Sequence, residues 1–173
     1  EICNRLEALV VSSWPVQVEQ SNLDEIGVVF PTIKIALERD LPLLTVGNGM
    51  HILNQGFGGD IGNEVHNHEA IMREGNDVSA YHRIYISPGS KLAAVVGSGG
   101  FVRVNSRHNR GIRDIHKSPL LLASAYSVED GVIEALESPN HDWVIGVQFQ
   151  PERRLEMPPH FDRLFKSLVE RAM

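Results

Sequence analysis

The prediction of the fold starts from the stretch LPLLTVGNGMHILNQGFGG, residues Leu41–Gly59. Its first half is an apolar, β-type run that ends in Gly-Asn-Gly, and its second half carries apolar residues at helical spacing. The chain is therefore predicted to turn sharply from a buried strand, Leu41–Val46, into a helix, Asn48–Phe57. Sharp strand-to-helix turns are where α/β hydrolytic folds present a nucleophilic Ser or Cys above the sheet. Here the residue at the apex is Gly47, which has no side chain.

Strand-like and helix-like patterns alternate on both sides of this turn. Before it, Leu6–Ser13 predicts a strand and Leu23–Arg39 a helix, in which Pro31 leaves open a break or a kink. After it, Gly58–Ala80 is polar and without periodicity, which predicts a long loop. The remaining predicted elements are strands at residues 81–87, 101–106, 120–127, 132–138 and 143–148 and helices at residues 90–96 and 158–173. This order predicts one three-layer α/β domain over residues 1–173, whose mixed sheet gains antiparallel strands late in the chain.

The composition limits the partners and the location of the protein. Of the 173 residues, 42% are hydrophobic and 22% are charged, and the formal net charge is −6. A negative balance argues against nucleic acid and anionic membranes as partners, because both recruit clustered Lys and Arg. No apolar run approaches the roughly 18 residues that span a bilayer, and no signal peptide opens the chain, so we expect a cytoplasmic protein. The abrupt start at Glu1 suggests that an upstream segment is missing, removed or disordered.

Four stretches, in chain order, resemble one family, the class I glutamine amidotransferase-like hydrolases, and within it the gamma-glutamyl-gamma-aminobutyrate hydrolase branch. LPLLTVGNGMHILNQ resembles that branch's Leu-Pro-Val-Leu-Gly-Ile-Cys-Arg-Gly-Met-Gln-Leu-Leu-Asn segment. ISPGSKLAAVVG and VRVNSRHNRGI are similar to its Pro-Gly-Ser-x-Leu and Val-Asn-Ser-x-His-His-Gln segments. ASAYSVEDGVIEALESPNHDWVIGVQFQPE is similar to its Ala-x-Asp-Gly-x-x-Glu-Ala strand pair and its closing Gly-Val-Gln-Trp-His-Pro-Glu. The resemblance implies a flavodoxin-like α/β fold with a mixed, mostly parallel sheet, and the family's N-terminal first strand region has no counterpart here.

The resemblance also implies a mechanism of thiol acyl transfer. In the family, a Cys on the elbow attacks an amide or γ-glutamyl carbonyl, a His activates the thiol, and a Glu two residues after the His orients the imidazole. Carried over to this chain, the nucleophile position is Gly47, the base position is Gln150 and the orienting carboxylate is Glu152. Glycine offers no nucleophile, and the neutral amide of glutamine cannot take up a proton near pH 7. Two of the three catalytic positions therefore have the wrong chemistry.

Backbone N–H groups of the elbow and of a Gly-Gly loop hold the oxyanion in the family. That loop falls on Ser12 and Ser13 of this chain. With Asn48 next to the elbow and His108 in the NSRHNR segment, these two serines are the predicted substrate-binding residues.

The predicted function is that of a catalytically inactive homologue, a binding or regulatory module for a glutamine-like or γ-glutamyl small molecule. The alternative is an active hydrolase of amide or γ-glutamyl C–N bonds. It would use a metal-activated water or a reassigned nucleophile, namely Ser12, Ser13 or Thr45 with His51 or His108 as base. A third hypothesis makes the chain one piece of a larger assembly that supplies the absent first strand, and a protein partner or a homodimer is also left open.

No cofactor and no metal site are predicted. The single cysteine, Cys3, excludes an intrachain disulfide and a cysteine-based zinc site. The sequence EVHNHE, with His66 and His68, offers imidazole and carboxylate groups that suit zinc. It lies in a polar segment without a third fixed ligand, so solvated histidines are expected there.

Overall fold

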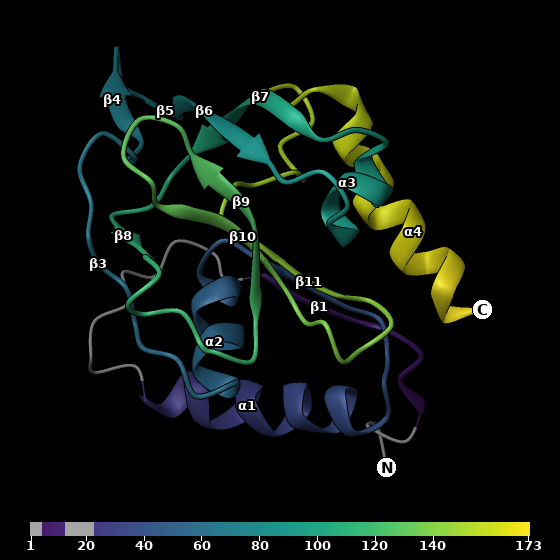
Figure 1. Ribbon diagram of the computed structural model, residues 1–173. Coiled ribbons are helices and arrows are strands. Elements are labelled where there is room, and N and C mark those ends of the chain that lie inside the picture. Colours follow the sequence, from purple (N-terminus) through teal and green to yellow (C-terminus); the bar gives the residue numbers. More distant parts are fainter. Residues whose placement is uncertain (1–4, 13–22) are drawn as a thin grey trace.

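A seven-stranded sheet between two layers of helices forms the body of the computed structural model, which describes residues 5–12 and 23–173 (Figure 1). The strands of this sheet are β1 (Leu9–Ser12), β2 (Leu43–Val46), β6 (Ala80–Ile86), β7 (Gly100–Ser106), β9 (Leu122–Ser127), β10 (Ile133–Glu137) and β11 (Val144–Val147). The short strands β3 (Asn63–Glu64) and β8 (Arg110–Gly111) pair with each other, as do β4 (Ile71–Arg73) and β5 (Asn76–Val78). The helices are α1 (Leu23–Glu38), α2 (Asn48–Gly56), α3 (Lys91–Val96), the 3₁₀ turn η2 (Pro159–Asp162) and α4 (Arg163–Ala172).

The strand order of the large sheet is β1-β2-β11-β10-β9-β6-β7. β2 pairs in parallel with β1 and with β11, whereas the other four pairings are antiparallel. The predicted α/β fold with a mixed sheet is confirmed. The expectation of a mostly parallel sheet is wrong for the described residues, because short connections join several late strands, and a parallel crossover needs a dozen residues or more.

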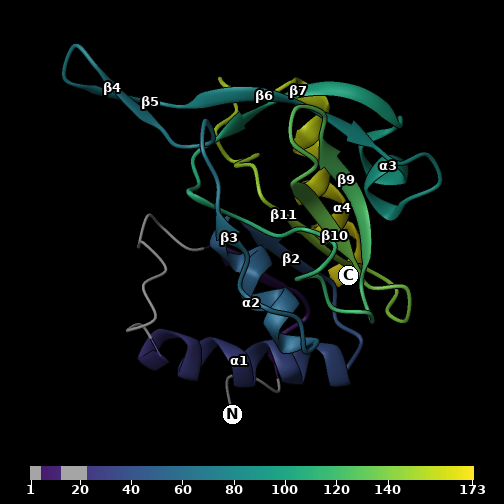
Figure 2. The ribbon, with the colours of Figure 1, turned by 60° about the vertical axis from the view of Figure 1, so that its left-hand side comes forward.

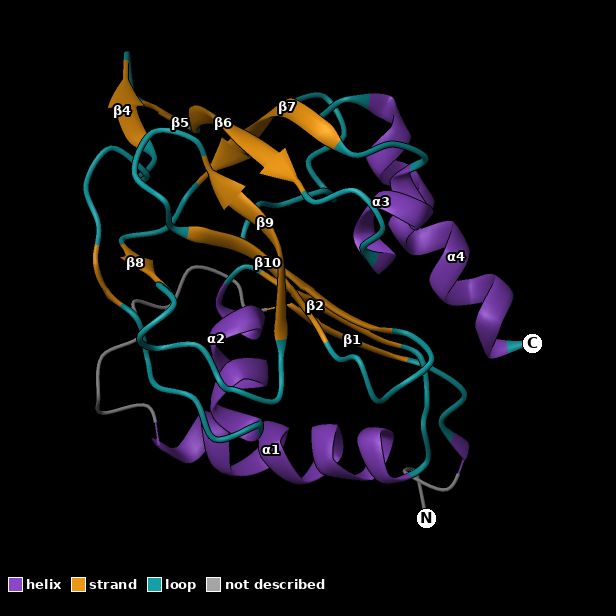
Figure 3. Ribbon diagram, in the orientation of Figure 1, coloured by secondary structure: helices purple, strands orange, loops and turns teal. Residues whose placement is uncertain are grey.

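The two faces of the sheet are covered by different helix pairs. α1 and α2 lie on one face and α3 and α4 on the other (Figures 1 and 3). Successive residues of β2 serve both layers: Leu43 packs with α1 and α2, whereas Leu44 packs with α3 and α4. Leu164 and Leu168 of α4 are buried in the second of these cores, so the C-terminal helix docks on the sheet as its pattern predicts.

At Pro31, where the sequence left a break or a kink open, α1 continues without a break, and Pro31 is exposed. One prediction about the irregular parts is wrong. The segment predicted as one long loop contains β3 and a hairpin of β4 and β5, which projects from the body of the molecule (Figure 2). Glu74 and Gly75 form the tip of that hairpin with φ of 50° and 79°, the left-handed conformations of a two-residue hairpin turn. Among the helices of the described residues, none has the length and hydropathy to cross a membrane.

Candidate active site

The turn between β2 and α2 has the backbone geometry of an elbow. β2 ends at Val46 and α2 begins at Asn48, so Gly47 alone joins them. Gly47 has φ 59° and ψ −124°, a conformation that costs a residue with a side chain about 1–3 kcal/mol but that glycine adopts readily. Its N–H donates to the carbonyl of Val147 in β11 (2.8 Å), and its own carbonyl accepts from the N–H of Met50 (3.0 Å). Backbone hydrogen bonds therefore hold the bend without any side chain at position 47.

The second glycine of the turn is required by close packing. A Cβ on Gly49 would lie 2.4 Å from the carbonyl oxygen of Val11 in β1. α2 thus approaches β1 more closely than a side chain at this position allows. The Gly-Asn-Gly sequence therefore serves both the bend and the seating of the helix.

Gln150, the residue at the predicted base position, faces the elbow. A Cβ on Gly47 would lie 4.0 Å from Gln150 Nε2. Gln150 Oε1 accepts a 2.7 Å hydrogen bond from Arg153 Nε. Since a guanidinium group can only donate, this bond turns the amide so that its NH₂ group points away from Arg153 and is the end nearest to Gly47. The structure thus brings the residues at the two predicted catalytic positions, Gly47 and Gln150, close together.

A polar network that the sequence did not predict supports Gln150. Asn105, at the end of β7, accepts from the backbone N–H of Gln150 (2.8 Å) and donates to its carbonyl (3.0 Å). Asn105 also donates to Glu156 Oε2 (3.0 Å), and Arg153 forms an ion pair with Glu156 (3.2 Å). The VNSRHNR and GVQFQPE segments are therefore joined at the elbow. The asparagine inside the predicted Val-Asn-Ser motif was the only signal for this contact.

Glu152 differs from an orienting carboxylate in its surroundings. The residue as a whole is exposed. Burial of the carboxyl group itself is nevertheless sufficient to raise the pKa of Glu152, and the charge of Arg153 opposes this only in part. A raised pKa is the opposite of what stabilisation of a neighbouring imidazolium requires. Its assignment as the orienting residue remains a prediction.

The predicted substrate-binding residues fall into three groups. Ser12 ends β1 opposite Val46 and is exposed, and Asn48 is the half-buried first residue of α2, so both flank the elbow. Ser13, like Cys3, lies outside the described residues. His108 is buried and has other polar partners, described below. The binding roles of these four residues remain predictions.

Two of the residues considered for a displaced nucleophile and base, Thr45 and His51, are closed to solvent. Thr45 is 0% exposed, and its hydroxyl has no hydrogen-bond partner among residues 5–12 and 23–173. His51 in α2 is 2% exposed, and burial, with the charge of His108 adding to it, lowers the pKa of His51 to about 4. The amide of Gln148 lies close enough to oppose this shift, although it does not meet hydrogen-bond geometry with His51. In this conformation, Thr45 is a packed core residue.

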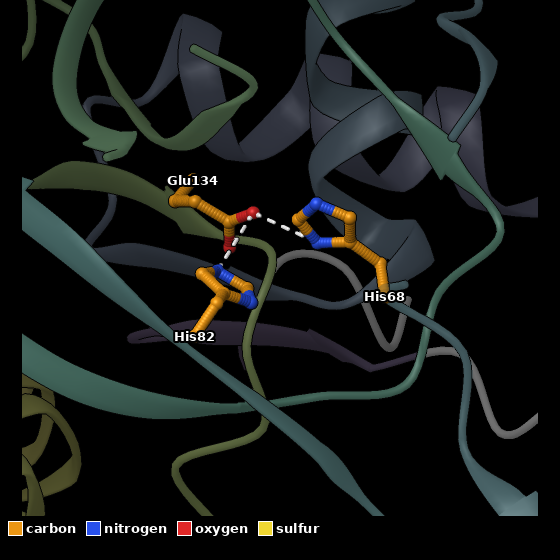
Figure 4. Close-up of side chains that lie close together, drawn as sticks. All are labelled: His68, His82 and Glu134. Carbon is orange, nitrogen blue, oxygen red and sulfur yellow. Dashed lines mark ion pairs between the residues drawn. The ribbon is translucent and has the colours of Figure 1, made fainter. Parts of the chain in front are cut away.

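A second group of polar residues lies buried beside the sheet. His68, from the segment after β3, and His82 in β6 point toward Glu134 in β10 (Figure 4). The shortest nitrogen–oxygen distances to Glu134 Oε1 are 3.8 Å for His68, 3.2 Å for His82 and 3.5 Å for His108. The expectation of solvated histidines is wrong for His68, which is 3% exposed, whereas His66 is exposed as expected.

The charges in this group are strongly coupled. Burial acts to raise the pKa of Glu134, but His108 and then His82 outweigh it and lower that pKa to about 2. Burial acts to lower the pKa of His82, and Glu134 more than compensates, so the pKa is raised. The pKa of His68 is lowered by burial and by repulsion from His108. Although the distances are short, neither Glu134 oxygen meets hydrogen-bond geometry with a partner in the described residues.

Two surface hollows lie away from the elbow. One, of about 510 Å³, lies between α3 and α4 and is lined by residues that include Lys91, Trp143 and Arg163. The other lies along α1 and is lined by residues that include Phe30, Ile33 and Leu37. Neither hollow includes Gly47 or Gln150 in its lining, so the predicted site rests on the elbow geometry.

Comparison with known proteins identifies the class. Residues 24–152 match the model of the Peptidase C26 family. The chain is 34% identical over 149 residues to a Mycobacterium tuberculosis protein named as a glutamine amidotransferase, an alignment that covers 83% of this chain and 44% of the relative. It is 28% identical over 128 residues to gamma-glutamyl-gamma-aminobutyrate hydrolase PuuD of Escherichia coli, covering 69% of this chain and 49% of PuuD. The chain therefore belongs to the Peptidase C26 family of class I glutamine amidotransferases.

A structural comparison supports the fold. The crystal structure of a Thermoplasma acidophilum protein, described as a component of GMP synthase, superimposes with a TM-score of 0.76 at 16% identity. The superposition covers 99% of this chain and 75% of that one. At this level of identity, the likeness shows the class I glutamine amidotransferase-like fold alone. The chain spans about half the length of the two relatives named above.

Proposed function

We propose that this chain is a catalytically inactive member of its family and that the elbow region binds a glutamine-like or γ-glutamyl small molecule. One observation carries the proposal. A Cβ on Gly47, at the predicted nucleophile position, would lie 4.0 Å from the amide of Gln150, at the predicted base position. The two residues lie close together, and neither can perform its step of acyl transfer.

The backbone around the elbow supports a binding role. α2 begins immediately after Gly47, so the partial positive charge of the helix N-terminus lies at the turn and favours carboxylate or carbonyl oxygens. Gln150 has its oxygen engaged by Arg153, which leaves its NH₂ group to donate to a ligand. A γ-glutamyl compound carries a carboxylate and an amide carbonyl, which are acceptors of the kind these groups bind.

A displaced catalytic device has less support from the structure. Thr45 is fully buried, and His51 is held neutral by burial in the core. Ser12 is exposed at the end of its strand. A covalent adduct at Ser12, Ser13 or Thr45, found by mass spectrometry after incubation with an electrophilic glutamine analogue, would replace the binding proposal by the hydrolase alternative.

Ligand binding can be tested by calorimetry with glutamine and with a γ-glutamyl amine. Gln150→Leu should weaken binding about fivefold, because a hydrogen bond of roughly 1 kcal/mol is lost. Gln55→Leu, the same substitution near the distant end of α2, is the matched control and should leave affinity unchanged. No heat of binding with the unmodified protein, or an equal loss in both variants, would contradict a ligand site at the elbow.

A further inference from the structure

The buried histidine group beside Glu134 has too many acceptors for the donors that face it. His68 Nε2 lies 3.1 Å from Asp130 Oδ2, and His108 Nδ1 lies 2.8 Å from the carbonyl oxygen of Arg110. A carboxylate and a carbonyl can only accept, so each of these ring nitrogens carries its proton outward. The opposite nitrogens, His68 Nδ1 and His108 Nε2, are then lone pairs in the neutral rings.

Those two lone pairs converge with the Glu134 carboxylate. His68 Nδ1 and His108 Nε2 are 3.2 Å apart, and they lie 3.8 Å and 3.5 Å from Glu134 Oε1. Ser106 is nearby, 3.3 Å from His68 Nδ1, but its hydroxyl donates to the carbonyl oxygen of His68 (2.8 Å). Three acceptor atoms therefore face one another in a buried space, which is unfavourable unless a cation lies between them.

The spacing of the three atoms fits a metal ion. The centre of the circle through the three atoms is about 2.0 Å from each, which equals the bond length of zinc to histidine nitrogen or carboxylate oxygen. His82 Nε2 lies 3.2 Å from Glu134 Oε1, but the ring centroids of His82 and His108 are 6.4 Å apart, too far for both imidazoles to bind this ion, so His82 is a neighbour of the site. One ligand atom each from His68, His82 and Glu134 lies within 4.8 Å of the other two.

Burial and unmet hydrogen bonding distinguish this group from a surface cluster. The side chains of His68, His82, His108 and Glu134 are 4%, 7%, 4% and 0% exposed. Both oxygens of Glu134 and both ring nitrogens of His82 lack a hydrogen-bond partner in the described residues. Buried polar groups are normally satisfied, and a bound metal would take the Glu134 carboxylate as a ligand and so remove its lack of a partner.

We propose that His68, His108 and Glu134 bind one divalent transition-metal ion of the zinc class. Two imidazoles and one carboxylate form a donor set that suits zinc, and the outward bonds of His68 to Asp130 and of His108 to Arg110 are the outer-shell contacts that orient metal-binding imidazoles. The ligands come from the segment after β3, from the loop after β7 and from β10. The ion therefore fastens that segment and that loop to the sheet.

Metal content of the purified chain tests this proposal. After dialysis against zinc and then against metal-free buffer, the unmodified protein should retain close to one ion per chain, and cobalt in its place should give the visible absorption of a tetrahedral site. Glu134→Gln, which keeps the size of the side chain, should weaken binding at least about 100-fold. Asp130→Asn, which changes only an outer partner, should weaken it about 10–100-fold. His66→Asn, at an exposed histidine two residues before His68, is the matched control and should bind normally.

Two results would overturn the proposal. The first is an unmodified protein that retains no zinc or cobalt above the buffer blank. In that case a proton on one of the imidazoles, and not a metal ion, lies between the facing acceptor atoms. The second is metal binding that survives Glu134→Gln but is lost in His66→Asn, which would place the ion elsewhere. If Glu134→Gln does not fold, the unmodified protein and Asp130→Asn decide the matter. The proposal is independent of ligand binding at the elbow, because metal content is measured without any substrate.

Discussion

Substitution of Gly47 by alanine tests whether the folded protein requires the left-handed backbone conformation at position 47. The added methyl group meets nothing closer than Gln150 Nε2 at 4.0 Å, which is ordinary van der Waals contact. The effect must therefore come from the conformation, φ 59° and ψ −124°, which residues with a side chain adopt at a cost of about 1–3 kcal/mol. The smaller entropy of the unfolded alanine chain offsets about 0.4–1 kcal/mol of this.

A net loss of about 1–2 kcal/mol in the free energy of unfolding is therefore expected for Gly47→Ala. For a domain of this size, this corresponds to a fall in Tm of roughly 2–8 °C. Urea denaturation and calorimetry measure both quantities. Gly56→Ala is the control, because Gly56 is the last residue of the same helix and has a negative φ, and its change should stay below about 1 kcal/mol. If Gly47→Ala is as stable as the parent protein, the backbone can leave the elbow conformation, and the reasoning fails.

Three further predictions concern named contacts. Gly49→Ala should destabilise the protein by about 1–3 kcal/mol in urea denaturation, since its methyl group would lie 2.4 Å from Val11 O; an unchanged midpoint would mean that α2 shifts freely. His51 has a pKa lowered to about 4, so its contribution to stability is intact above the unfolded value of 6.5 and is lost as the pH falls toward 4, by about 3 kcal/mol. The free energy of unfolding should be measured against pH for the unmodified protein and for His51→Leu, both of which keep the charged neighbours Glu134, His108 and Arg110. The unmodified protein should lose more stability between pH 6.5 and pH 4, and equal slopes would refute the prediction. Gly47→Cys with Gln150→His should create a thiol that reacts with iodoacetamide faster than Gly47→Cys alone, and equal rates would show that the two positions do not face each other.

The parts of the fold that follow from local pattern were predictable. The apolar run that ends in Gly-Asn-Gly predicted β2, the bend and α2, and local pattern predicted β6, β7, β9, β10 and β11 to within a few residues, whereas the two-residue strand β8 was not predicted. The hairpin of β4 and β5 was missed because each strand has three residues, too few for periodicity, although Glu74-Gly75 was an available turn signal. The number of parallel strand pairs was overestimated. That expectation came from the family resemblance and not from the lengths of the connections between the strands of this chain.

The candidate site was predictable only where a motif carries it. Gly47 and Gln150 come from stretches about a hundred residues apart, and only the resemblance related them; the structure then placed them in contact distance. Asn105 and the buried position of Glu134 could not be predicted, because a long-range hydrogen bond and a buried charge leave no periodic trace in the sequence. His68 shows the same limit, since a polar local sequence predicted exposure and tertiary packing buried it.

The elbow is expected to carry out no acyl transfer, and an assay of amide hydrolysis tests this directly. Steady-state release of ammonia from glutamine and of amine from a γ-glutamyl amine should be followed with the purified, unmodified chain. We expect a rate equal to that of the buffer blank and unchanged in Gln150→Leu. Sustained turnover by the unmodified chain that is abolished in Gln150→Leu, but not in Gln55→Leu, would contradict it.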